Sequence, residues 1–112
     1  MNEAQFEQQG AGGCRLSGPL TFDTVPQLLQ QGRQLFANGR AVELDLSRVE
    51  RSDSAGLALL VSLVRQARQQ GGAITFLNVP EQLRGLASVG GVEQILAFPF
   101  VSNEPKRNDA VR

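Results

Sequence analysis

Hydrophobic and polar positions change their spacing near the middle of the chain. Between residues 40 and 47 apolar and polar residues alternate, which is the period of a strand with one buried face. The apolar members of this strand are Val42, Leu44 and Leu46. After a short polar stretch, leucines and valines recur at i, i+3, i+4 and i+7, which is the spacing of an apolar helix stripe. This inward stripe consists of Leu57, Leu60, Val61 and Val64. The pattern predicts a central strand, a polar loop and a helix over residues 54–70.

The same kind of pattern predicts further elements on both sides of this centre. Residues 4–9 and 14–20 are expected to form a hairpin, joined by the glycine-rich residues 10–13. A helix begins at Asp23 or Thr24, with Pro26 near its first position, and ends at Asn38-Gly39. Residues 73–79 form a strand, a helix then opens at Pro80, and residues 95–101 form a last strand or extended segment.

These elements indicate an α/β fold with a mixed sheet of four to five strands. Strands that are separated by helices become parallel neighbours, whereas the N-terminal hairpin adds an antiparallel edge. The clean alternation of the central strand implies that helices pack mainly on one face of the sheet. We expect a single domain over residues 1–101 and a flexible tail over residues 102–112, which have almost no apolar content.

The charges of the chain are balanced and scattered. Eleven Lys and Arg residues offset eleven Asp and Glu residues, and no basic stripe is visible. Nucleic acid and anionic membranes are bound chiefly by concentrated positive charge, so neither is expected as the main partner. The N-terminal residues lack the basic and apolar regions of a signal peptide, and no apolar run reaches the length of a membrane span. A cytoplasmic location is therefore expected.

The composition also limits the chemistry of the chain. His, Tyr and Trp are absent, so the commonest general base and metal ligand are missing, and a His-assisted Ser or Cys nucleophile is excluded. Cys14 is the only cysteine, and its place before an apolar strand favours a small core residue over a reactive thiol. We expect no cofactor, no metal site and no enzymatic activity.

The turn between the central strand and its helix is the candidate functional site. Ser52, Asp53 and Ser54 are all good N-cap residues, and a helix start carries free N–H groups and the positive end of the helix dipole. One interpretation is capping alone, with Gly56 allowing the helix to approach the sheet closely. A second is a phosphorylation switch at Ser54, where the adjacent Asp53 would oppose the phosphate.

A third interpretation is a nucleotide or phosphate site with Arg48 and Arg51 as counter-charges, although the loop has no glycine-rich phosphate cradle. A fourth concerns the outer side of the helix, where the predicted stripe turns Ala55, Ala58, Ser62 and Gln66 outward, with Leu59 at the border. This side carries no charge over its first two turns, so it is typical either of a docking surface or simply of good helix formers.

Two segments together resemble the STAS domain family, which includes the bacterial anti-sigma-factor antagonists. They are LSGPL at residues 16–20, before the first predicted helix, and DSAGL at residues 53–57, before the leucine-rich helix. The similarity covers residues 14–101. In the antagonists the switch serine directly follows the Asp of this turn, a position that falls on Ser54, and it is phosphorylated by a serine kinase that is also the anti-sigma factor.

The segments LSGPLTFDTVPQLL, residues 16–29, and DSAGLALLVSLVRQAR, residues 53–68, resemble another STAS branch more closely, the MlaB type. Antagonists usually carry Ser at the position of Ala55 and an acidic residue at that of Thr21. The MlaB type is the small cytoplasmic subunit of the phospholipid-trafficking ABC transporter that maintains outer-membrane lipid asymmetry. This resemblance implies a non-enzymatic accessory subunit, peripheral to the inner membrane, that binds the ATPase subunit. The alternative is an antagonist switched by phosphorylation of Ser54.

We therefore predict that a protein partner binds the turn and the adjacent helix face. The candidate partner-binding residues are Arg48, Arg51, Asp53, Ser54, Ala55, Gly56, Ala58, Leu59 and Ser62.

Overall fold

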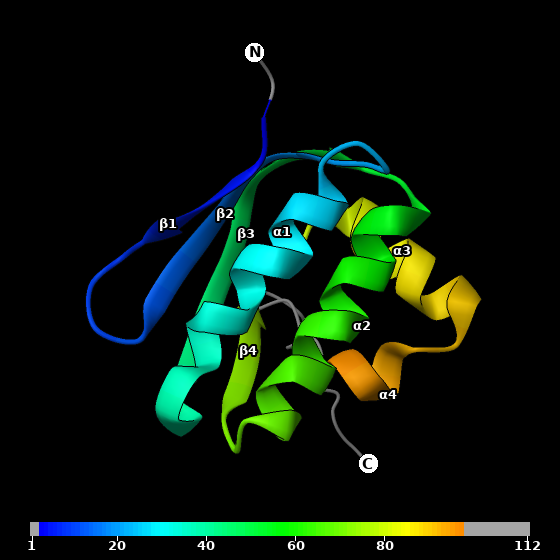
Figure 1. Cartoon of the computed structure of the whole chain (residues 1–112). Coiled ribbons are helices and arrows are strands. Elements are labelled where there is room, and N and C mark those ends of the chain that lie inside the picture. Colours follow the sequence, from blue (N-terminus) through cyan, green and yellow to red (C-terminus); the bar gives the residue numbers. More distant parts are fainter. Residues whose placement is uncertain (1–2, 98–112) are drawn as a thin grey trace.

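The computed structural model describes residues 3–97 as one mixed sheet with helices packed against one of its faces (Figure 1). The strands are β1 (Gln5–Gln8), β2 (Gly13–Leu20), β3 (Ala41–Ser52) and β4 (Ala73–Leu77). The helices are α1 (Val25–Gly32), the 3₁₀ helix η1 (Arg33–Gly39), α2 (Ser54–Gln69), α3 (Glu81–Gly90) and α4 (Glu93–Leu96). This architecture confirms the α/β fold predicted from the periodicity.

The sheet has the strand order β1-β2-β3-β4. β1 and β2 form the predicted antiparallel hairpin, with Phe6 opposite Leu16. β2, β3 and β4 are parallel neighbours, with Cys14 opposite Leu44 and Leu44 opposite Phe76. Because parallel strands end at the same edge, the loops that follow β2, β3 and β4 lie together at one end of the sheet.

The core lies between the helices and the face of the sheet that they cover. The predicted strand positions Val42, Leu44 and Leu46 are buried there. Phe36 in η1 and Phe76 on β4 are both fully buried. Cys14 is buried as well, as its sequence context predicted.

The first helical segment is less regular than predicted. α1 ends at Gly32, and η1 contains the non-helical residues Phe36, Ala37 and Asn38. Asn38 has a φ of 63° and Gly39 one of 73°, so both residues adopt the left-handed conformation that ends a helix. The predicted end at Asn38-Gly39 is therefore confirmed, but the segment bends before it reaches that point.

β3 is longer than the predicted strand and runs on to Ser52. Its pairing with β2 shifts twice, between Arg15 and Ser17 and again between Gly18 and Leu20. Extra residues of this kind bend a strand and increase its twist. The prediction of a polar loop over residues 48–52 is wrong, because these bulges let a polar stretch remain paired in the sheet.

The end of the described chain also differs from the prediction. Residues 93–96 form the short helix α4, and Leu96 is buried in the core. Ile95 therefore belongs to a helix and not to a strand, and Ala97 ends that helix with a φ of 51°. The rest of the predicted last strand, including Phe98 and Phe100, and the predicted tail over residues 102–112 lie outside the described residues.

Candidate functional site

Asp53 organises the turn that joins β3 to α2. Its backbone is extended, and its Oδ1 accepts a hydrogen bond of 2.8 Å from the backbone N–H of Ala55. Its own N–H donates to the carbonyl oxygen of Leu20 at 3.1 Å, which ties the turn to the end of β2. Asp53 is thus the N-cap of α2, and it satisfies one of the free N–H groups at the helix start.

Ser52 fixes the turn from the other side. It is buried, its N–H donates to Oε1 of Gln82 on α3 at 3.2 Å, and its hydroxyl donates to the carbonyl oxygen of Asp53 at 3.0 Å. Hydrogen bonds therefore join the end of β2 and the first turn of α3 to the turn at the start of α2.

The side chain of Ser54 takes no part in these hydrogen bonds. Because Asp53 provides the cap, the Ser54 hydroxyl is not needed for capping, and Ser54 is exposed. Within residues 3–97 its side chain has no hydrogen-bond partner. The prediction of an accessible hydroxyl at the helix start is confirmed.

Gly56 lies where α2 comes closest to the sheet. A Cβ at this position would overlap the Ser52 side chain and would stand 2.9 Å from Cβ of Leu20. Gly56 is itself buried. This geometry fits the close packing of helix against sheet that the sequence suggested for Gly56. Gly56 does not lie on the surface.

The inward side of α2 is rotated from the predicted one. Ala55 and Leu59, predicted to face outward or to lie at the border, are buried with relative exposures of 7% and 0%. Leu57 and Val61, predicted to face inward, are only half-buried. The observed buried residues of α2 are Ala55, Gly56, Leu59, Leu60, Leu63, Val64 and Ala67.

The reason for this rotation is that apolar residues surround the first turns of α2 almost completely. The periodicity therefore fits two neighbouring stripes equally well. α2 packs on the sheet between α1 on one side and α3 with α4 on the other, and this placement selects the stripe that contains Leu59 (Figure 1). Leu59 cannot contact a partner directly in this structure.

We call Ser54, Ala58 and Ser62 the α2 outer face, which begins beside Asp53. Ser54 and Ala58 are exposed, whereas Asp53 and Ser62 are half-buried. The first charged residue of α2 is Arg65, so the helix presents no charge over its first two turns beyond the Asp53 cap. The half-buried Leu57 and Val61 flank this strip.

Arg48 and Arg51 lie on β3, and the prediction that they belong to a loop is wrong. Both are exposed. Arg48 is opposite Ser17 and lines a hollow of about 470 Å³ together with Glu7 and Arg15 on the face of the sheet that the helices leave open. The two arginines are therefore not gathered together at the helix start, as a nucleotide or phosphate site there would require.

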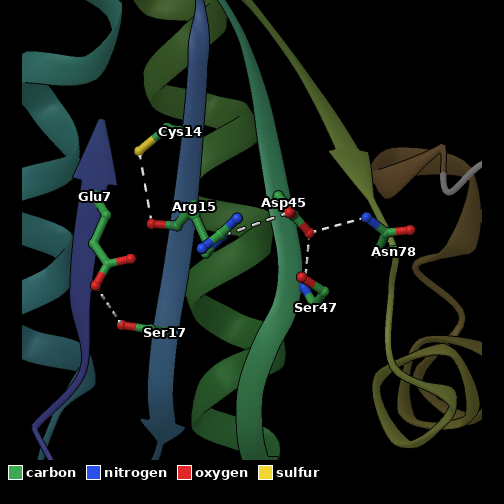
Figure 2. A network of polar contacts seen from close by, with 7 residues as sticks. All are labelled: Glu7, Cys14, Arg15, Ser17, Asp45, Ser47 and Asn78. Carbon is green, nitrogen blue, oxygen red and sulfur yellow. Dashed lines mark hydrogen bonds and ion pairs between the residues drawn. The ribbon is translucent and has the colours of Figure 1, made fainter. Parts of the chain in front are cut away.

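The open face of the sheet carries a network of polar contacts (Figure 2). Asp45 accepts hydrogen bonds from the Asn78 amide at 3.0 Å and from the Ser47 N–H at 2.9 Å, and its Oδ2 lies 3.7 Å from Nε of Arg15. Ser17 donates to Glu7 at 3.4 Å. Desolvation raises the pKa of the Asp45 carboxyl, but these hydrogen bonds and the charge of Arg15 outweigh it, so the pKa lies below its ordinary value.

Cys14 lies beside this network but belongs to the core. Its Sγ is 3.9 Å from the carbonyl oxygen of Arg15. Burial raises the pKa of the Cys14 thiol, which disfavours the reactive thiolate. Within the described residues, no three His, Cys, Asp or Glu side chains are grouped so that they could hold a metal ion.

Sequence analysis missed Phe22 as a candidate. This residue lies on the loop between β2 and α1, and its side chain is 73% exposed. A signal was present in the sequence, because an aromatic residue among turn-forming residues has no periodic apolar neighbours to pack with. The turn and cap formers around Phe22 predicted only a helix start.

Comparison with known proteins identifies the family. The sequence matches the family model described as "Mlab, STAS domain" over residues 4–97. This chain belongs to the STAS family. It is 33% identical over 89 residues to the intermembrane phospholipid transport system binding protein MlaB of Escherichia coli (strain K12), a match that covers 80% of this chain and 90% of that protein.

Solved structures support the STAS fold. A STAS domain protein from Planctomyces limnophilus aligns with a TM-score of 0.65 at 20% identity, covering 93% of this chain and 92% of that one. The unphosphorylated anti-sigma factor antagonist SpoIIAA aligns with a TM-score of 0.59 at 18% identity, covering 78% and 83%. In the part of the chain that the structure describes, no helix is long and apolar enough to cross a membrane.

Proposed function

We propose that this STAS protein is a non-enzymatic accessory subunit of a phospholipid-transporting ABC transporter. It binds the ATPase subunit through the α2 outer face, with the Ser54 turn at the centre of the contact. The chain is then cytoplasmic and reaches the inner membrane only through the transporter complex. The similarity to MlaB, a binding protein of the intermembrane phospholipid transport system, supports this assignment to a transport system.

The observation that carries the proposal is the neutral, exposed start of α2. Exposed helices are normally solubilised by charged side chains, whereas here Ser54, Ala58 and Ser62 present small uncharged groups. Small side chains leave room for a partner's backbone to come close, and little side-chain entropy is lost when they are covered. The hydroxyl of Ser54 can donate one hydrogen bond and accept others from the partner.

Ala58→Arg tests this proposal. Ala58 is exposed, so a long charged side chain is accommodated in the free protein but blocks close approach of the ATPase subunit. We expect binding to purified ATPase subunit, measured by titration calorimetry, to weaken about 100-fold or more. The melting temperature should stay unchanged.

Ala11→Arg is the matched control for this experiment. It introduces the same side chain at an exposed position in the β1–β2 loop, at the other end of the sheet from the start of α2 (Figure 1). This variant should bind like the unmodified chain. If Ala58→Arg binds equally well, the ATPase subunit docks elsewhere and the proposed surface is wrong.

The second candidate is an anti-sigma-factor antagonist switched by phosphorylation, and the exposure of Ser54 favours it. A phosphate would add about two negative charges to a neutral face beside the Asp53 carboxylate, and it would change the fit of any partner. Incubation with a serine-kinase anti-sigma factor and ATP, followed by intact-mass measurement, distinguishes the two functions. The antagonist function is supported if the unmodified chain gains a phosphate and then releases the kinase, and if Ser54→Ala gains none.

A further inference from the structure

We propose that Phe22 is the aromatic anchor of the contact with the ATPase subunit and inserts into an apolar pocket of that protein. This inference rests on the proposed function, because it extends the α2 outer face onto the neighbouring loop. It adds a residue that neither the turn motif nor the helix pattern includes.

Phe22 is a large apolar residue that is exposed to solvent. Its side chain is 73% exposed, whereas Phe36 and Phe76 are fully buried. An exposed aromatic ring costs free energy in water, and covering it with a partner recovers that free energy. A single exposed apolar residue is common on protein surfaces, so its exposure has to be considered together with its setting.

The loop that carries Phe22 is fixed by hydrogen bonds. The Thr24 hydroxyl donates to the carbonyl oxygen of Pro19 at 2.8 Å and accepts from the N–H of Thr21 at 2.9 Å. The N–H of Val25 donates to the carbonyl oxygen of Thr21 at 2.9 Å. The backbone around Phe22 is therefore preorganised, and little conformational freedom is lost when a partner covers the ring.

This loop adjoins the start of α2. Leu20, two residues before Phe22, pairs with Ser52 in the sheet and accepts the hydrogen bond from the N–H of Asp53. Both segments lie at the upper edge of the molecule in Figure 1. The two segments are therefore neighbours, and one partner can contact both of them.

The area of the ring shows that Phe22 can be only one part of an interface. One aromatic side chain buries about 150–250 Å², whereas a stable interface needs about 1,200 Å² or more in total. Phe22 alone therefore cannot hold a second copy of this chain or any other partner. Its loop is joined to the start of α2 through Leu20 and Asp53, so the larger contact includes the α2 outer face, whose occupant under the proposed function is the ATPase subunit.

The test compares Phe22→Ala with Ala58→Arg in binding to the purified ATPase subunit. Phe22→Ala should weaken the affinity about 10- to 100-fold, mainly through faster dissociation, because aromatic anchors at interfaces have effects of this size. Ile95→Ala is the matched control, since it truncates an exposed apolar side chain on α4, away from the turn. It should leave the affinity unchanged, and both variants should keep their melting temperatures.

The outcomes separate this inference from the proposed function. If Ala58→Arg abolishes binding and Phe22→Ala binds normally, the proposed function stands and the anchor is wrong. If neither change weakens binding, both are wrong. If Phe22→Ala instead converts a dimer of the free chain to a monomer in light scattering, the ring serves contacts between copies, and the inference is overturned.

Discussion

The two exposed surfaces of this protein differ in how their polar groups are used. On the open face of the sheet, charged side chains contact each other, as in the pairing of Asp45 with Arg15 (Figure 2). On the α2 outer face, Ser54 is exposed and its hydroxyl has no partner among residues 3–97. A surface whose polar groups bind one another supports the fold, whereas a neutral surface with an unused hydroxyl remains available to a partner. Substitutions on the first should change stability, and substitutions on the second should change binding.

The largest effect on stability is expected directly beneath the α2 outer face, at Leu59. Leu59→Ala removes a fully buried side chain from the core and should lower the free energy of unfolding by about 2–5 kcal/mol. Urea denaturation followed by circular dichroism measures this loss. The neighbouring Ala58→Arg should change stability by less than about 0.5 kcal/mol. Equal losses at both positions would show that the boundary between core and binding surface is misplaced.

Leu59 also shows what sequence alone can predict. The change from strand to helix period correctly predicted β3 and α2, because alternation in a half-buried strand has few alternatives. The side of α2 that packs against the core was predicted wrongly, because leucines and valines occupy nearly all sides of its first turns. Only the tertiary placement between α1 and α3 decides which of them are inside.

The site itself was only partly predictable. Asp53, Ser54 and Ala58 form a local pattern around a helix start, so their exposure or capping could be inferred from spacing. The position of Arg48 on the open face depends on strand bulges in β3, and sequence periodicity does not reveal such bulges. Phe22 was missed because its proximity to the turn comes from the pairing of β2 with β3.

The next effect concerns the close approach of α2 to the sheet. Gly56→Ala places a methyl group against Ser52 and Leu20, and it should destabilise the protein by about 1–3 kcal/mol. Gly85→Ala is the matched control, because this glycine lies inside α3 with no atom within 4 Å of an added Cβ. It should stabilise the protein by about 0.5–1 kcal/mol, since alanine is the better helix former. Chemical denaturation of both variants measures this difference in stability. A Gly56→Ala variant more stable than the unmodified chain would contradict the prediction.

A smaller effect is expected at Asp53, which caps α2 directly beside the α2 outer face. Asp53→Ala removes the cap on the Ala55 N–H and should cost about 1 kcal/mol of stability. Asp53→Asn keeps an acceptor at the same position and should recover most of that loss, because Asn is an equally good cap. Thermal unfolding of the two variants gives the comparison. If the Asn variant is as unstable as the Ala variant, the charge and not the hydrogen bond stabilises the turn.

The last effect, similar in size to that at Asp53, concerns Asp45 on the open face of the sheet and appears as a pH dependence. The pKa of this carboxyl is lowered in the folded protein, so the folded state favours the charged form more than the unfolded state does. Its contribution is therefore fully present above the unfolded pKa, near 3.8, and is lost as the pH falls through the lower folded value. Asp45→Asn should cost about 0.5–1.5 kcal/mol at pH 7.

The difference in stability between Asp45→Asn and the unmodified chain should also shrink as the pH falls below about 4. Glu43→Gln removes one negative charge from the same strand, where Glu43 is exposed and has no side-chain hydrogen bond or ion pair within the described residues. Its stability difference should be small at both pH values. If Asp45→Asn behaves in the same way, the contacts in Figure 2 do not stabilise the fold, and the contrast between the two surfaces loses its physical basis.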